Sequence, residues 1–172
     1  MRVLGIDPGS ETLGWGVIKS DGRIYRLLQY GTVKSSPRDA FADRLLKIAE
    51  GVEEIIERFE PDALSIEEAF YAANVKVALK LGQVRGVVLY LAAKHKLDIG
   101  EYAPRLIKQT VVGYGNAEKH QVQEMIRILL KLPHVPEPHD AADALAAAIC
   151  HFHHAESKQR LLAAQAKIKI PR

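Results

Sequence analysis

Residues 3–17 read VLGIDPGSETLGWGV and contain the features from which the fold follows. An apolar run over residues 2–7 ends in Asp7, Pro8-Gly9-Ser10 marks a turn, and a second apolar run covers residues 12–18. Short apolar runs separated by a Pro/Gly/Ser cluster predict two strands joined by a tight connection. A carboxylate at the end of a buried strand costs free energy unless a positive partner neutralises it. Asp7 is therefore the first candidate functional residue.

The segments that follow continue this pattern. Asp21-Gly22 predicts a hairpin into a third strand over residues 23–33, which completes an antiparallel meander. Residues 37–60 repeat apolar side chains every three or four positions, which predicts a helix that stops at Pro61. The rest of the chain predicts a strand over 63–66, a largely buried helix over 75–95, a strand over 98–102, and helices over 104–112, 116–132 (with Asn116 as N-cap) and 139–156.

This order of elements predicts an α/β fold with a central five-stranded mixed sheet and helices on both faces. We expect the first, fourth and fifth strands to be the central ones. Residues 1–157 are predicted to form a single domain, and residues 158–172 a basic, flexible C-terminal tail.

Three further carboxylates stand at the ends of predicted elements. Glu67 follows the fourth strand, and Asp140 and Asp143 lie three residues apart in the first turn of the last helix, on one helix face. If the first and fourth strands pair, Asp7 and Glu67 become neighbours, and the last helix must cross the same spot. Carboxylates that converge on one point repel each other unless a cation lies between them. Oxygen-only ligand sets suit hard divalent ions, above all Mg²⁺, so the cluster predicts metal-assisted chemistry on a phosphate.

Composition restricts the function further. The chain has 172 residues, 48% of them hydrophobic and 26% charged, which is typical of one globular domain. No apolar run approaches the length of a membrane span, and the first residues predict a strand and not a signal peptide. The single cysteine, Cys150, cannot form an internal disulfide, which fits a cytoplasmic protein. The net charge of +3 is local, because residues 158–172 contain five basic residues and no acidic one.

Four motifs together closely resemble the bacterial Holliday junction resolvases of the RuvC family. They are GIDPGSETLGWGV, IEEAFYAANVKVALKLGQVRG, KQTVVGYGNAEKHQVQEMI and DAADALAAAICH, in the family's order and spacing up to about residue 155. The resemblance implies a ribonuclease H-like fold, a homodimer, and symmetric nicking of four-way DNA junctions in recombination and repair. It also implies two Mg²⁺ ions per site, replaceable by Mn²⁺, and the branch-migration complex RuvA-RuvB as a partner.

The resemblance assigns roles by position. Asp7, Glu67, Asp140 and Asp143 match the catalytic, metal-binding acids, and Glu67 is preferred to Glu68 because the family pattern I-E-x-x-F includes Phe70. Some relatives carry histidine where this chain has Asp140, and here His139 stands one place earlier. The family's DNA-contacting positions fall on Phe70, Lys108 and Lys119, with Lys119 also catalytic, and we add Lys76 as a candidate phosphate contact.

Simpler interpretations compete at several positions. Asp7 is also a plausible turn cap, and Asp140 or Asp143 an ordinary first-turn acid that the helix dipole favours. Lys76 and Lys80 equally fit a solvated helix face, and Tyr71 is the alternative to Phe70 as the exposed aromatic. For the whole chain, the alternatives are an actin-like or sugar-kinase ATPase, a related ribonuclease H-like nuclease on another nucleic acid, and a non-catalytic junction-binding module. An ATPase of that kind needs a second domain, for which 172 residues leave no room.

Overall fold

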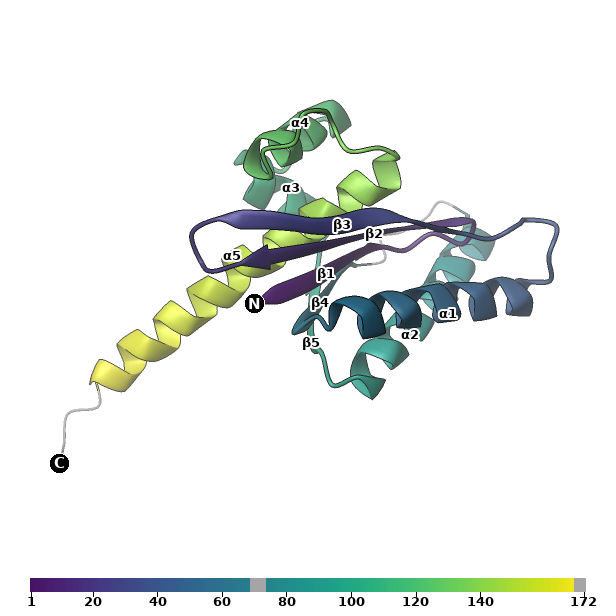
Figure 1. Cartoon of the computed structure of the whole chain (residues 1–172), viewed down its shortest axis with the longest axis horizontal. Coiled ribbons are helices and arrows are strands. Elements are labelled where there is room, and N and C mark those ends of the chain that lie inside the picture. Colours follow the sequence, from purple (N-terminus) through teal and green to yellow (C-terminus); the bar gives the residue numbers. More distant parts are fainter. Residues whose placement is uncertain (69–73, 169–172) are drawn as a thin grey trace.

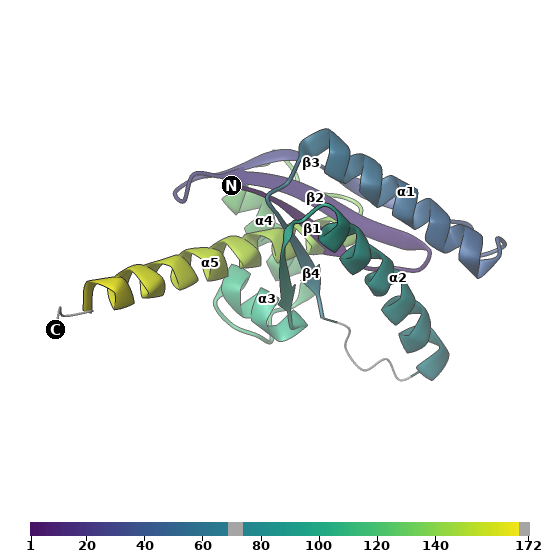
Figure 2. The ribbon, with the colours of Figure 1, turned by 90° about the horizontal axis from the view of Figure 1, so that it is seen from below.

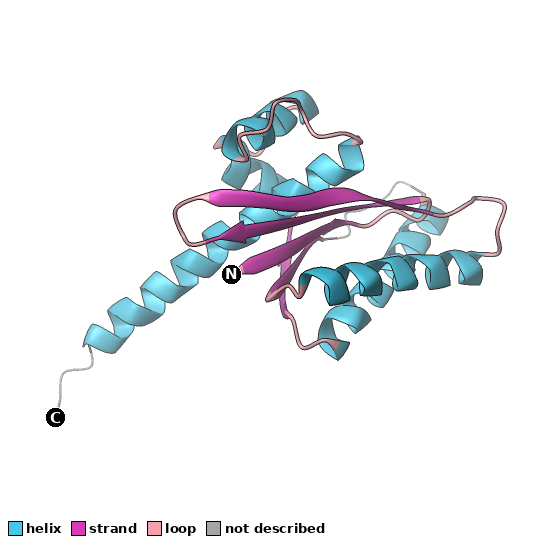
Figure 3. Ribbon diagram, viewed as in Figure 1, coloured by secondary structure: helices cyan, strands magenta, loops and turns pink. Residues whose placement is uncertain are grey.

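The computed structural model describes the backbone of residues 1–68 and 74–168, and the side chains of these segments as far as Ala155. The elements follow the predicted order (Figure 1, Figure 3). They are β1 (Arg2–Asp7), β2 (Thr12–Ser20), β3 (Tyr25–Lys34), α1 (Phe41–Phe59), β4 (Ala63–Glu67), α2 (Val75–Lys94), β5 (Asp98–Tyr102), α3 (Pro104–Val112), α4 (Lys119–Leu129) and α5 (His139–Ile168).

The five strands form one mixed sheet in the order β3-β2-β1-β4-β5, which confirms the predicted fold class. β1 pairs with β2 and β2 with β3 in antiparallel fashion, whereas β1–β4 and β4–β5 are parallel. The expectation that β5 is central is wrong, because β5 lies at the edge of the sheet. Its sequence, DIGEY, buries only Gly100, and a strand with polar residues on both faces suits an edge.

Helices cover both faces of the sheet (Figure 2). On one face, Leu4 and Ile6 of β1 pack with buried residues of α1 and α2. On the other face, Val3 of β1 packs with α3, α4 and the central part of α5. The alternation of residues 3, 4 and 6 between two cores follows from the two-residue repeat of a strand. The apolar stripe of α1 faces the first of these cores, and the helix ends at Glu60, which takes a left-handed backbone (φ 43°) just before Pro61.

Several predicted helix ends differ from the observed ones, among them the starts of α1 and α4 and the end of α5. α4 begins at Lys119 with Glu118 as N-cap, and not with Asn116. Glu118 and Gln121 form a capping box in which the Glu118 N–H donates to Gln121 Oε1 at 2.9 Å, so two helix-end groups are satisfied at once. α5 continues to Ile168, beyond the expected end near residue 156, because residues 155–168 are rich in Ala, Leu, Lys and Gln and contain no Gly or Pro. The C-terminal part of α5 extends past the sheet in Figures 1 and 2, while flexibility of residues 158–172 stays a prediction.

The prediction that α2 is largely buried is wrong. Val84, Val88, Leu91 and Ala92 face the core, but Val75, Leu79 and Tyr90 are 71%, 64% and 66% exposed. The prediction failed because apolar residues occur on nearly every side of this helix, whereas the rest of the chain packs against only one side. Among the described residues, no helix has both the length and the apolar character needed to cross a bilayer.

Candidate active site at the carboxyl ends of β1 and β4

Asp7 and Glu67 end two neighbouring parallel strands. The register pairs Ile6 of β1 with Ile66 of β4, and the two carboxylates occupy the next position of each strand. Their side chains therefore lie on the same face of the sheet at the same edge. This placement confirms the expectation that β1 and β4 pair and bring the two acids together.

α5 supplies the other two carboxylates from its first turn. It crosses the sheet face that Asp7 occupies, in contact with β1, β2 and β4. The Pro136–Pro138 loop leads into it, and the backbone N–H of Ala141 donates to the Pro138 carbonyl at 3.0 Å. Asp140 and Asp143 thus lie within electrostatic reach of Asp7, because both charges raise its pKa.

The electrostatics of the strand carboxylates show mutual repulsion in a poorly hydrated place. The pKa of Asp7 is raised from 3.8 to about 7, mainly by burial and further by the negative charges of Asp143, Glu67 and Asp140, while the Lys119 charge lowers it. Burial likewise raises the pKa of Glu67, followed by the charge of Asp143, whereas Lys108 and Lys119 lower it. Two carboxyl groups that resist ionisation in the absence of a cation are the expected signature of a cation-binding site.

Lys119, the first residue of α4, is the cation in direct contact with the acids. Its Nζ lies 3.0 Å from Asp143 Oδ2. Burial lowers the pKa of Lys119, but the hydrogen bond and charge of Asp143 outweigh burial, so the pKa is raised and the ammonium stays charged. Lys119 belongs to α4 and Asp143 to α5, so this ion pair links the start of α4 to the acid pair of α5.

A cleft of about 290 Å³ opens beside these groups. Glu67, Lys108, Lys119 and Asp143 line its polar side, and Pro104, Ile107, Val122 and Ala146 its apolar side. Carboxylates and ammonium groups in one cleft suit a phosphate that reaches the acids through a bound cation and touches the lysines directly.

The donor set fits a hard divalent ion. Every candidate ligand is a carboxylate oxygen, and oxygen ligands are the ones that Mg²⁺ prefers. Within residues 1–68 and 74–155, no three His, Cys, Asp or Glu side chains stand close enough to enclose an ion. Asp143 Oδ2 is instead in contact with the Lys119 ammonium. The fit therefore rests on the chemistry of the donors and on the raised pKa values of Asp7 and Glu67.

His139 points to a neighbour other than the acids. Its Nδ1 lies 2.5 Å from Nε2 of Gln123, a buried residue of α4. Asp140, by contrast, acts electrostatically on both Asp7 and Lys119. The geometry therefore favours Asp140 over His139 as the group that faces the acid cluster.

The remaining sequence candidates lie outside this cleft or outside the described residues. Phe70 and Tyr71 fall in 69–73, which the structure does not describe. Lys76 is exposed on the first turn of α2, whose N-cap is Asn74. Glu68 is exposed, and its backbone N–H donates to the Tyr102 carbonyl at 2.9 Å, which continues the β4–β5 pairing.

One residue near the site was not anticipated from the sequence. Arg44 of α1 is 4% exposed, and its guanidinium donates to the Ser10 carbonyl in the turn after Asp7 and to Ser35 Oγ. Ser35 Oγ itself donates to the same Ser10 carbonyl at 3.0 Å. Arg44 thus anchors the turn that follows β1. Its position three residues after Phe41 and four before Ile48 was the only signal, since a charged residue there interrupts the apolar stripe of the helix.

The raised pKa of Asp7 predicts a pH dependence for metal binding. Below about pH 7 the Asp7 carboxyl is protonated in the metal-free protein, so protons compete with Mg²⁺. We expect the apparent Mg²⁺ affinity to fall by up to about tenfold per pH unit below pH 7 and to level off above pH 8. Calorimetric titration with Mg²⁺ at pH 6, 7 and 8 measures this, and an affinity that does not change with pH would contradict the assigned role of Asp7.

Comparison with known proteins shows what the chain is similar to. Residues 3–151 match the family model described as crossover junction endodeoxyribonuclease RuvC. The RuvC of Chloroflexus aggregans is 48% identical over 160 residues, which cover 93% of this chain and 98% of that protein. The RuvC of Ruminiclostridium cellulolyticum is 49% identical over 151 residues, which cover 88% and 91%. The solved structure of T. thermophilus RuvC in complex with Holliday junction substrate superposes with a TM-score of 0.88 at 38% identity, covering 92% of this chain and 96% of that one.

Proposed function

The chain belongs to the RuvC family of crossover junction endodeoxyribonucleases, and on this premise we propose that it resolves four-way DNA junctions by paired, symmetric, Mg²⁺-dependent nicks. Its fold is the ribonuclease H-like fold of that family. The observation that carries the proposal is the meeting of two strand-end carboxylates with the acid pair of α5, beside two lysines in one cleft.

The acidic and the basic residues of the site have different proposed roles. Asp7, Glu67, Asp140 and Asp143 would hold two Mg²⁺ ions, with Mn²⁺ as a substitute. When bound, the metal lowers the pKa of a water molecule and polarises the phosphate. Asp7 and Glu67, held on rigid strands, fix the position of the cluster, and Asp143 orients the Lys119 ammonium toward the scissile phosphate. Lys108, which also lines the cleft, contacts a second oxygen of this phosphate or the neighbouring phosphate.

The DNA contacts extend beyond the cleft. Phe70 is proposed to stack on a base that becomes unpaired at the junction centre, a contact that tolerates any base because each has a π-face. Lys76 is proposed to contact a backbone phosphate from the start of α2, where it is exposed. We further propose a cytoplasmic location and cooperation with the branch-migration complex RuvA-RuvB, which the family resemblance supports.

A homodimer completes the proposal, since a junction with two-fold symmetry needs two equivalent sites. The outer face of α2 is the surface that suits it. Five residues at spacings of three or four form one exposed stripe there: Val75, Leu79, Gly82, Gly86 and Tyr90. A Cβ at Gly82 or Gly86 would meet no atom within 4 Å, so these glycines leave open space into which a second helix can pack closely. The occupant we propose is α2 of a second copy, which would bury the stripe that one chain leaves exposed.

One experiment tests the function as a whole. The purified protein is incubated with a labelled four-way junction and Mg²⁺, beside a linear duplex and an RNA–DNA hybrid of the same sequence. We expect paired nicks at symmetric positions of the junction and little cleavage of the other two substrates. Preferential cleavage of the hybrid would favour a related nuclease, and tight junction binding without cleavage at any metal concentration would favour a non-catalytic module.

A further inference from the structure

α5 lies on a row of small residues that crosses the sheet. The strand registers place Gly16 of β2 opposite Gly5 of β1, Gly5 opposite Ser65 of β4, and Ser65 opposite Gly100 of β5. Side chains of paired residues point to the same face of a sheet. The four strands therefore present one continuous shallow channel on the α5 side, with almost no side-chain volume in it.

α5 follows this channel residue by residue. A Cβ at Gly16 would meet the Leu145 side chain, a Cβ at Gly5 would lie 1.9 Å from the Ala144 carbonyl oxygen, and a Cβ at Gly100 would lie 2.3 Å from His151 Nδ1. At the third position, Ser65 Oγ donates a buried hydrogen bond of 2.7 Å to the Ala147 carbonyl. The backbone of α5 thus rests directly on the backbone of the sheet.

The same contact continues to the acid cluster. Gly14 is the register partner of Asp7, so its missing side chain would point to the Asp7 face. A Cβ at Gly14 would lie 2.0 Å from the Asp140 carbonyl oxygen and 2.3 Å from its carbon. Both catalytic strands also carry a small residue two positions before their acid, Gly5 before Asp7 and Ser65 before Glu67. These two small residues lie on the same face as the acids, under α5.

We propose that Gly14, Gly5 and Ser65, named here the α5 seat, are positioning residues that set the distance between the two strand carboxylates and the Asp140–Asp143 pair. Any side chain at Gly14 or Gly5 lifts the first turns of α5, because the colliding atoms are helix backbone and cannot rotate away. The acid pair moves with that turn, so the seat controls the metal-binding geometry without touching metal or substrate. The inference rests on the proposed function, because it assigns a cation to the four acids.

Gly14→Ala is the direct test, and Gly16→Ala is its matched control. Both add one methyl group in the same strand on the same face, but the close contacts of a Cβ at Gly16 are with the Leu145 side chain and not with helix backbone. We expect Gly14→Ala to weaken Mn²⁺ binding by about 10–100-fold, the usual cost of disturbing the support of metal ligands. Gly16→Ala should lower the melting temperature yet bind Mn²⁺ nearly as the parent chain does. Calorimetric titration with Mn²⁺ alone and thermal unfolding supply the two readouts.

A second variant covers the case in which Gly14→Ala does not fold. Ser65→Ala removes one oxygen atom from a buried position and introduces no collision, so the fold persists while the tether to Ala147 is lost. We expect Mn²⁺ affinity to fall by about tenfold. Unchanged Mn²⁺ affinity in a folded Gly14→Ala, or in Ser65→Ala if Gly14→Ala is unfolded, overturns the inference, as does an equal loss in Gly16→Ala. A parent chain that binds no divalent ion would instead overturn the proposed function.

Discussion

Replacing Asp7 with asparagine is expected to abolish junction cleavage, lowering the rate by at least about 100–1,000-fold. The amide keeps the shape of the side chain but removes the charge that a divalent ion requires. Junction binding should survive or become tighter, because one negative charge fewer opposes the approach of phosphate. Glu67→Gln and Asp143→Asn should behave in the same way. Single-turnover cleavage and binding titrations, the latter in Ca²⁺, separate the two effects.

The same variant should make the metal-free protein more stable. The pKa of Asp7 is raised in the folded state, so its contribution to stability is fully present below about pH 4 and is lost as the pH rises through about 7. At pH 8 the parent chain therefore holds an unfavourable buried charge that Asp7→Asn lacks. Each 1 kcal/mol gained raises the melting temperature by about 2–4 °C for a chain of this size. Thermal unfolding in chelator at pH 5 and pH 8 should show the gain mainly at pH 8.

Glu68→Gln is the matched control for the acid variants. Glu68 stands next to Glu67 in the sequence but is exposed, and its backbone N–H donates to the Tyr102 carbonyl. Its neutralisation should leave cleavage, metal affinity and stability close to those of the parent chain. If Asp7→Asn instead lost binding and melted at a lower temperature, Asp7 would be the turn cap that the sequence also allows, and the catalytic assignment would fail.

Leu79→Glu is expected to separate the dimer. The parent chain of 19.1 kDa should sediment at about twice that mass, with the stripe of α2 buried between two copies. A carboxylate at position 79 would be buried without a partner, at a cost of about 3 kcal/mol or more, which raises the dissociation constant more than 100-fold. Paired nicking should then become single nicking, while each monomer keeps its fold, because Leu79 is 64% exposed and packs on no core.

Leu46→Glu controls for the added charge. Leu46 is 57% exposed, close to the exposure of Leu79, but belongs to α1 and not to the α2 stripe. Analytical ultracentrifugation of the two variants beside the parent chain gives the result directly. A monomeric parent chain, or a Leu79→Glu protein that stays dimeric, would remove α2 as the interface.

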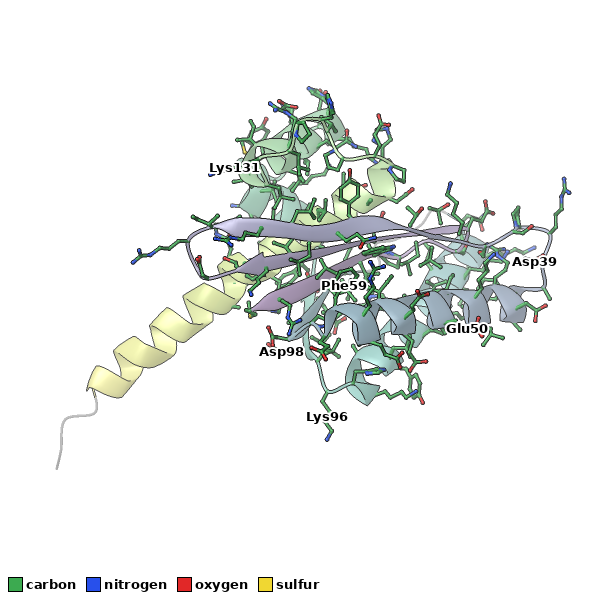
Figure 4. All side chains as sticks on the ribbon, in the orientation of Figure 1. Asp39, Glu50, Phe59, Lys96, Asp98 and Lys131 are labelled. Atoms are coloured by element: carbon green, nitrogen blue, oxygen red, sulfur yellow. The ribbon has the colours of Figure 1, made fainter. Side chains whose placement is uncertain are left out.

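The sequence by itself determined the order and type of the elements and which acids are candidates for the site. Local signals suffice for that: the Pro8-Gly9-Ser10 turn, the apolar repeat of α1, and carboxylates placed where strands and a helix end or begin. The sequence also indicated that Asp7 and Glu67 become neighbours if β1 and β4 pair, and the structure fulfils that condition. The roles of surface side chains are harder to predict from the sequence. In Figure 4, Asp39 in the β3–α1 loop and Lys96 before β5 point away from the fold, and the sequence pattern names no contact for such residues.

Only the tertiary structure decided how far α5 stands from the sheet and which side of α2 is covered. Glycines at positions 5 and 14 read as strand residues in the sequence, and the reason for them appears only once the carbonyls of Ala144 and Asp140 lie against them. Likewise, the apolar character of α2 predicts burial, but one chain covers only the side that holds Val84 and Val88. The physical reason is the same in both cases. The repeat of apolar residues indicates which side of a helix or strand prefers an apolar environment. How closely two elements approach, and which element covers a given side, is set by packing between segments far apart in the sequence.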